Sequence, residues 1–252
     1  MSIYPKLATF LAKKSYRFYM NTRFVTEAKV SGATLKIPVG NGIGLNLIDF
    51  AQPSVLSVIR LLQERGYTGV FLDIGANCGI VLLNLLSVSR EIPYVGFEPD
   101  VHGAASIRDI IRLNDLENHQ IIATAVGSQP GIARLSSNMQ GDVSATLSLD
   151  LRPKQMYGRG WDVVVVRMDD FLEGYLSGKP LFCVKIDVEG FEQAVLEGMA
   201  NTLKTHRAPC YFEVMGCKHF VEGTYDRAYF GGELPPEEIA RLIDNRTRNA
   251  EA

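Results

Sequence analysis

Three acidic residues, each at the end of an apolar segment, are the residues of this sequence best suited to chemistry. They are Asp73 in Gly69-Val-Phe-Leu-Asp, Glu98 in Tyr94-Val-Gly-Phe-Glu, and Asp187 in Leu181-Phe-Cys-Val-Lys-Ile-Asp. A carboxylate accepts hydrogen bonds from hydroxyl groups and attracts cationic amino groups. Short runs of β-branched and aromatic residues predict strands, so we expect the acids at strand carboxyl ends, where open α/β sheets bind their ligands.

The glycine turn after the first acid indicates which ligand binds there. Gly75 and Gly79 lie four residues apart, and an apolar run that predicts a helix follows them. A dinucleotide-binding turn has three glycines and holds a pyrophosphate, whereas here Asn77 fills the middle slot and the Asp73 carboxylate would repel phosphate. Asp73 suits the amino group of S-adenosylmethionine, and Gly75 lets the backbone approach it. Glu98 suits the two ribose hydroxyls, so the pattern predicts S-adenosylmethionine as cofactor.

The rest of the pattern alternates strands and helices and predicts a doubly wound, mostly parallel, Rossmann-like α/β sheet. Strands are expected at 69–73, 94–98, 121–127, 180–187 and 209–214, and helices at 80–86, 104–114 and 191–203. Such alternation gives parallel strands joined by right-handed crossovers. The strand at 180–187 is expected beside the first one, so that Asp187 and Glu189 border the reactive end of the cofactor.

The segment after Gly127 departs from this alternation. Strands are expected at 132–135 and 163–166, separated by a polar stretch that contains Gly141-Asp-Val-Ser144 and is too long for a plain turn. A long loop beside a cofactor site is a candidate wall or lid.

Residues 1–52 are expected to form an N-terminal helix and hairpin extension of a Rossmann-like domain at 53–252. Residues 34–38 and 44–48 flank a Gly-Asn-Gly turn and predict a β-hairpin, and Pro53 begins a helix. Residues 1–26 carry five basic residues and no acid, with apolar residues interleaved. A basic helix on an anionic membrane is one interpretation. A helix packed on the domain or on a second copy of the chain is favoured, because the apolar positions form no single stripe.

The composition argues against several other classes of protein. A net charge of −2 gives no general attraction to nucleic acid. The strand expected at 180–187 ends in Asp-Val-Glu-Gly, without an aromatic residue there that could stack on a flipped base, so no nucleic-acid partner is expected. Four cysteines without a Cys-x-x-Cys pair indicate reduced thiols in a cytoplasmic protein, and no apolar run reaches membrane-spanning length.

Five segments over residues 68–200 resemble, in order and spacing, the FkbM-type S-adenosylmethionine-dependent methyltransferases. They are Phe71-Leu-Asp-Ile-Gly-Ala-Asn-Cys-Gly79, Gly96-Phe-Glu-Pro-Asp100, Ala125-Val-Gly127, Met168-Asp-Asp170 and the most family-specific one, Lys185-Ile-Asp-Val-Glu-Gly-Phe-Glu192. The resemblance implies a class I methyltransferase that usually methylates hydroxyls of sugars or secondary metabolites. The expected cofactor-binding residues are Asp73, Gly75, Asn77, Gly79, Glu98, Pro99, Ala125, Val126 and Asp187.

Methyl transfer to a hydroxyl needs alignment of two molecules and removal of one proton. The candidate catalytic residues are Asp187, Glu213 at the end of the last predicted strand, and His219 shortly after it. A divalent cation held by carboxylates is the alternative to a base, although no residue is assigned as a metal ligand. The other histidines, His102, His119 and His206, are expected at the surface in or near helices.

Two other function classes stay open. A NAD-dependent oxidoreductase shares the Rossmann layout but is disfavoured by Asp73 and Asn77 in the turn. A cofactor-binding protein without turnover is compatible with the segment after Val214, in which no closing pair of strands is recognised. Either the N-terminal hairpin takes the place of that pair or the chain is a shortened member of the family.

Overall fold

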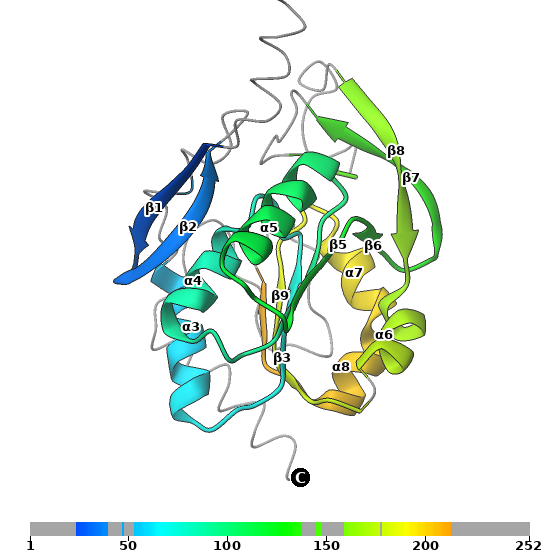
Figure 1. The fold of residues 1–252 in the computed structure, drawn as a ribbon. Coiled ribbons are helices and arrows are strands. Elements are labelled where there is room, and N and C mark those ends of the chain that lie inside the picture. Colours follow the sequence, from blue (N-terminus) through cyan, green and yellow to red (C-terminus); the bar gives the residue numbers. More distant parts are fainter. Residues whose placement is uncertain are drawn as a thin grey trace, which may run out of the picture.

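The computed structural model describes residues 24–39, 47, 53–137, 145–147, 159–176 and 178–212. They form a central five-stranded sheet, a two-stranded hairpin and a three-stranded sheet, with helices around the central sheet (Figure 1). The fold class predicted from the sequence is confirmed. The helix expected over most of 1–26, the stretch Gly141–Ser144, and the candidate catalytic residues Glu213 and His219 lie outside the described residues.

The central sheet is parallel, with the strand order β10-β9-β3-β4-β5. Its strands are β3 (Val70–Ile74), β4 (Tyr94–Phe97), β5 (His119–Ile122), β9 (Leu181–Ile186) and β10 (Cys210–Phe212). Every residue of β3, β4 and β9 is buried, as parallel strands covered on both faces require. β9 pairs with β3, and Asp73 lies opposite Lys185, which confirms the predicted neighbourhood of these two strands.

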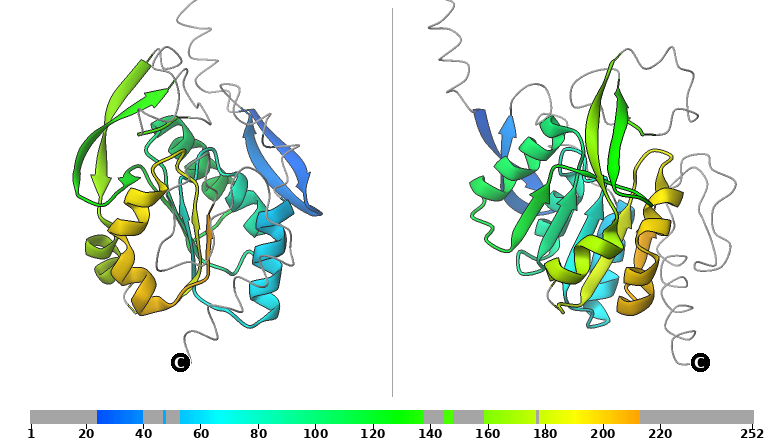
Figure 2. Two further views of the ribbon diagram at one scale, coloured as in Figure 1. Left: turned by 180° about the vertical axis from the view of Figure 1, so that it is seen from behind. Right: turned by 90° about the vertical axis from the view of Figure 1, so that its right-hand side faces the viewer.

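Helices cover both faces of the sheet, so it is doubly wound (Figures 1 and 2). On one face α3 (Pro53–Glu64), α4 (Ile80–Val88) and α5 (Val101–Leu113) pack in a core that includes Phe71 and Tyr94. On the other face α6 (Met168–Leu176), α7 (Glu192–Gly198) and α8 (Ala200–His206) pack against Leu72 and Phe97. Successive strand residues therefore serve opposite cores, as the period of two requires.

The N-terminal hairpin differs from the prediction. Its strands are β1 (Phe24–Val30) and β2 (Ala33–Val39), so residues 34–38 pair with the segment before them and not with 44–48. Ser31 and Gly32 both have positive φ, 47° and 96°, which suits a tight two-residue hairpin turn. Leu47, the described residue of 44–48, has helical backbone, so the predicted strand is wrong there.

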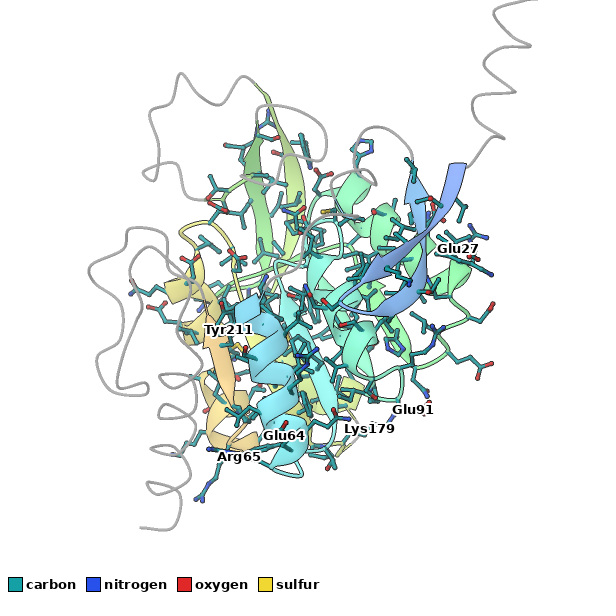
Figure 3. The ribbon with its side chains drawn as sticks, turned by 90° about the vertical axis from the view of Figure 1, so that its left-hand side faces the viewer. Glu27, Glu64, Arg65, Glu91, Lys179 and Tyr211 are labelled. Carbon is teal, nitrogen blue, oxygen red and sulfur yellow. The ribbon has the colours of Figure 1, made fainter. Side chains whose placement is uncertain are left out.

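A side-chain amide fastens the hairpin to the domain. Asn114, at the end of α5, accepts a hydrogen bond from Lys36 N at 3.0 Å and donates one to Lys36 O at 2.8 Å. Leu35 and Ile37 of β2 are buried in the same core as α3, α4 and α5. Glu27, labelled in Figure 3, lies on the exposed side of β1. The division of the chain at residue 52 stays a prediction.

The strand predicted at 121–127 is two strands in two different sheets. β5 ends at Ile122, and β6 (Ala125–Val126) pairs with β8 (Arg159–Val166), which also pairs antiparallel with β7 (Gly131–Ser137). Thr124 N donates to Ile122 O at 2.9 Å, a tight bend that redirects the chain between the sheets. The side chain of Thr124 then donates to Val164 O at 2.7 Å and joins the bend to β8.

The helix predicted at 191–203 is also divided, at Met199, into α7 and α8. Asp169 stabilises the new helix start, because its carboxylate accepts hydrogen bonds from Asn201 N at 3.2 Å and Thr202 N at 2.8 Å. Its other partner, Arg167, lies 2.8 Å away. The Met168-Asp-Asp170 segment thus joins α6 to α8.

Among the described residues, no helix is both long enough and apolar enough to cross a membrane.

Candidate active site

The carboxyl ends of β3, β4 and β9 lie side by side, with Ile74 paired to Phe97 on one side and to Ile186 on the other. The glycine turn after β3 crosses this edge and leads into α4. Its residues Gly75 and Ala76 donate backbone hydrogen bonds to Phe97 O at 2.9 and 3.0 Å. The sheet therefore brings the predicted turn and two of the predicted acids, Glu98 and Asp187, to one edge.

A glycine is required at position 75 because the chain at the end of β9 lies directly against it. Its φ is +80°, and a Cβ at this position would lie 1.8 Å from the carbonyl oxygen of Asp187. Asp187 N donates to Ile74 O at 3.0 Å, so the backbones of the turn and of the β9 end are in direct contact. The close contact at Gly75 in the structure is with the Asp187 carbonyl, and the expected approach of a ligand at Gly75 stays a prediction.

Glu98 follows β4 and holds the glycine turn. Its two carboxylate oxygens accept hydrogen bonds from Asn77 N and Asp100 N, each at 2.7 Å. The residue is 7% exposed. Burial raises the pKa of Glu98 to about 7, although the two backbone N–H groups act in the opposite direction. The backbone N–H of Asn77 thus fixes this carboxylate, whereas the expected contact of Asn77 with the cofactor stays a prediction.

Asp73 lies within β3, before the carboxyl end of the strand, and is fully buried. One carboxylate oxygen accepts a hydrogen bond from the hydroxyl of Tyr94 at 2.8 Å, and the other lies 3.3 Å from the ammonium of Lys185. Burial raises the pKa of Asp73, while Lys185 and Tyr94 lower it. Both oxygens of Asp73 therefore face groups of the protein.

Lys185 connects Asp73 of β3 with Asp187, which directly follows β9. Its side chain is 4% exposed, and its ammonium lies 3.3 Å from Asp73 and 3.3 Å from Asp187. It also donates a hydrogen bond to Gly75 O at 3.0 Å. Burial alone lowers the pKa of Lys185, but the charges of Asp187 and Asp73 outweigh burial and raise it above the ordinary value. The ammonium is therefore charged at neutral pH.

Asp187 is the more accessible acid of this cluster, with 22% of its side chain exposed. The loop after it is shaped by Glu192, whose carboxylate accepts hydrogen bonds from Gly190 N at 3.0 Å and Val188 N at 3.3 Å. The hydroxyl of Thr146 donates to Glu189 O at 2.6 Å. The described piece of the long polar loop, 145–147, therefore lies against the segment that carries Asp187.

Four residues of the site were given no role from the sequence, although two of them, Lys185 and Glu192, lie at the ends of the most family-specific segment: Tyr94, Thr146, Lys185 and Glu192. Lys185 could have been found, because the period of two places it on the same side of β9 as Asp187 and opposite Asp73. Glu192 stands two residues after Gly190, and nothing in that spacing distinguishes it from an ordinary helix residue. Tyr94 and Thr146 carry no local signal of their roles.

Other predicted residues lie differently. Ala125 and Val126 are buried in β6, which pairs with β8 and not with the central sheet. His119 is 4% exposed in β5 and stacks on Tyr94 with ring centroids 6.5 Å apart, so the expectation of a surface histidine is wrong. Burial, with a contribution from Arg90, lowers the pKa of His119 to about 4.

The described residues contain no group of three or more His, Cys, Asp or Glu side chains arranged to hold a metal ion.

This edge can bind a ligand that carries both a positive charge and hydroxyl groups. The glycine turn after β3 lies between Glu98 and Asp187, two carboxylates at the ends of the strands on either side of β3. Carboxylates attract a cation and accept hydrogen bonds from hydroxyls, whereas they repel a phosphate. The chemistry of these groups therefore fits S-adenosylmethionine better than a dinucleotide.

Comparison with known proteins gives the family. The model of the methyltransferase FkbM domain matches residues 73–247, which is more than half of the chain. Among solved structures, the crystal structure of M. jannaschii TYW2 in complex with AdoMet is similar at 19% identity and a TM-score of 0.26. That similarity covers 40% of this chain and 44% of the other. No curated protein matches the sequence. The chain belongs to the FkbM methyltransferase domain family.

Proposed function

We propose that this protein is an S-adenosylmethionine-dependent O-methyltransferase that acts on a hydroxyl of a sugar or another small metabolite. The observation that carries the proposal is the glycine turn held between the Glu98 and Asp187 strand ends in a chain of the FkbM methyltransferase family. The hydroxyl acceptor is inferred from the family resemblance described above.

Glu98 and Asp187 divide the cofactor between them in this proposal. Glu98 accepts hydrogen bonds from the ribose hydroxyls, because each of its oxygens can accept more than the one backbone N–H it already binds. Asp187 accepts the amino group of the methionine end. We assign that role to Asp187 and not to Asp73, because Asp73 is fully buried and its oxygens face Tyr94 and Lys185.

The protein's part in the reaction is alignment and removal of one proton. S-adenosylmethionine, held by Glu98 and Asp187, would supply an electrophilic sulfonium methyl group for the acceptor oxygen. The acceptor's proton goes to a base, for which Asp187, Glu213 and His219 are the candidates. A divalent cation bound by carboxylates would instead lower the pKa of the hydroxyl. Alignment supplies most of the acceleration.

Residues near Asp187 provide a wall for the acceptor. Thr146 joins the 145–147 segment to the Glu189 carbonyl, and Ser136 of β7 bonds in turn to Thr146 through backbone groups at 2.8 and 3.0 Å. The three-stranded sheet is thus connected to the loop after β9. We infer that the acceptor binds between this sheet and the cofactor, as expected of a long loop beside such a site.

Calorimetric titration tests the proposal with S-adenosylmethionine, S-adenosylhomocysteine and NAD. We expect the first two to bind and NAD not to bind. Glu98→Ala should weaken binding by about 2 kcal/mol, because its hydrogen bonds to the two ribose hydroxyls disappear. The matched control is Glu91→Ala, since Glu91 is an exposed glutamate away from the turn (Figure 3). Binding of NAD with no response to S-adenosylmethionine would refute the proposal.

A further inference from the structure

Lys185 is held at three points of the candidate active site. Its ammonium has three N–H groups. It donates to Gly75 O at 3.0 Å and lies 3.3 Å from both Asp73 Oδ1 and Asp187 Oδ2. A lysine side chain has several rotatable bonds, but one that is 4% exposed and surrounded by three oxygens has a defined position. The residue thereby joins the glycine turn to the ends of two strands.

We propose that Lys185 is a positioning residue that directs the carboxylate of Asp187 toward the amino group of the cofactor. The inference deepens the proposed function and rests on it. Oδ2 of Asp187 is held by Lys185, and among the described residues nothing hydrogen-bonds to Oδ1. With 22% of the Asp187 side chain exposed, this carboxylate is the one of the cluster that a ligand can reach.

Asp73 completes the arrangement from the buried side. A buried ammonium beside a single partly exposed carboxylate would be costly, because each charge loses its hydration. Asp73 is 0% exposed and supplies a second negative charge, which is itself held by the Tyr94 hydroxyl at 2.8 Å. The order of contacts is therefore Tyr94, Asp73, Lys185, Asp187, running from the core to the surface. In this order only Asp187 contacts the ligand.

A double-mutant cycle on ligand binding tests this role. The four proteins are the wild type, Lys185→Met, Asp187→Asn and the double variant, each titrated with S-adenosylhomocysteine, which has the same amino-acid end as S-adenosylmethionine. We expect Asp187→Asn to weaken binding about tenfold or more in the wild type. In the Lys185→Met background, Asp187→Asn should weaken ligand binding less than about threefold, because the Asp187 carboxylate is already misdirected.

A lysine that only stabilises the fold would give a different result. Lys185→Met would then lower the melting temperature, and Asp187→Asn would weaken binding by the same factor in both backgrounds, which would overturn the inference. Lys204→Met is the matched control, since Lys204 is exposed on α8 and should leave the Asp187→Asn factor unchanged.

Two further arms keep the experiment decisive. If Lys185→Met does not fold, the cycle is repeated in an Asp73→Asn background, which removes the buried carboxylate that Lys185→Met leaves without its cation. If the wild type binds neither S-adenosylmethionine nor S-adenosylhomocysteine, the proposed function fails and this inference fails with it. If the wild type binds and the two substitutions are additive, the inference alone fails.

Discussion

The buried carboxyl of Glu98 should make the stability of the protein depend on pH in an unusual direction. The pKa of Glu98 is raised from 4.5 to about 7, chiefly by burial. Because the folded-state pKa lies above the unfolded value, the folded chain binds this proton more tightly. The stability contributed by Glu98 is complete below pH 4.5 and is lost as the pH rises through about 7. Glu98→Gln removes this titration and nearly keeps the shape of the side chain.

The magnitude follows from the difference between the two pKa values. At about 1.4 kcal/mol for each pH unit, the loss amounts to about 3 kcal/mol between pH 4.5 and pH 7. His119 acts in the opposite direction, because its pKa is lowered from 6.5 to about 4 and its stability contribution is lost as the pH falls through that window. The two slopes partly cancel in the wild type. In Glu98→Gln the cancellation is absent.

Urea unfolding followed by circular dichroism, at several pH values from 4.5 to 8, measures the effect. The free energy of unfolding of the wild type minus that of Glu98→Gln should fall by about 3 kcal/mol as the pH rises from 4.5 to above 7. Loss of hydrogen bonds that Gln cannot replace changes this difference by the same amount at every pH, so it does not alter the dependence of the difference on pH. Glu91→Gln, at an exposed position, should show no such slope. A pH-independent difference for Glu98→Gln would refute the assignment of a buried, titrating carboxyl.

Two further predictions concern the turn and the acceptor side. Gly75→Ala should destabilise the fold by at least about 4 kcal/mol in urea unfolding, because its Cβ meets the Asp187 carbonyl, whereas Gly66→Ala, with a similar positive φ and open space, should cost about 1–2 kcal/mol. Equal costs would show that backbone strain alone matters. Asp187→Asn should slow methyl transfer to an identified acceptor about a hundredfold, and a chelator should slow the unmodified enzyme only if a metal ion takes part. Full activity of Asp187→Asn would remove this residue from the mechanism.

The central sheet could be predicted because its signals are local. Each core strand is a short apolar run bounded by a turn, and right-handed crossovers leave few ways to order such strands. The acids at the ends of the strands followed from the same pattern, which placed Glu98 and Asp187 at the edge where the structure has them. The family resemblance then supplied a class of reaction that spacing alone does not contain.

The errors arose where two local signals competed. Two turns, Ser31-Gly32 and the Gly-Asn-Gly stretch, could each join residues 34–38 to a partner strand, and both partners are apolar enough to pair. Packing of the hairpin on the domain selects one of these two pairings, in part through the hydrogen bonds of Asn114 to Lys36. Asn114 lies 78 positions away from Lys36 in the sequence. The continuous apolar run at 121–127 similarly conceals the bend at Thr124, because its bond to Val164 spans 40 positions. Such long-range contacts leave no periodic signal.

The sequence could not rank Asp73 against Asp187 as ligand contacts for a similar reason. Both follow apolar residues and both stand beside a glycine turn, so a ligand contact was expected from each. The pleat places Asp73 on the face covered by α3, α4 and α5, with Tyr94 and Lys185 as partners, whereas Asp187 lies beyond the last residue of β9, where the helices no longer cover it. A carboxylate inside a strand is enclosed by the sheet, and one just after it is presented to a ligand. Asp73 lies one residue before the end of β3 and Asp187 one residue after the end of β9, and in our proposal this difference of two positions separates a supporting charge from a binding one.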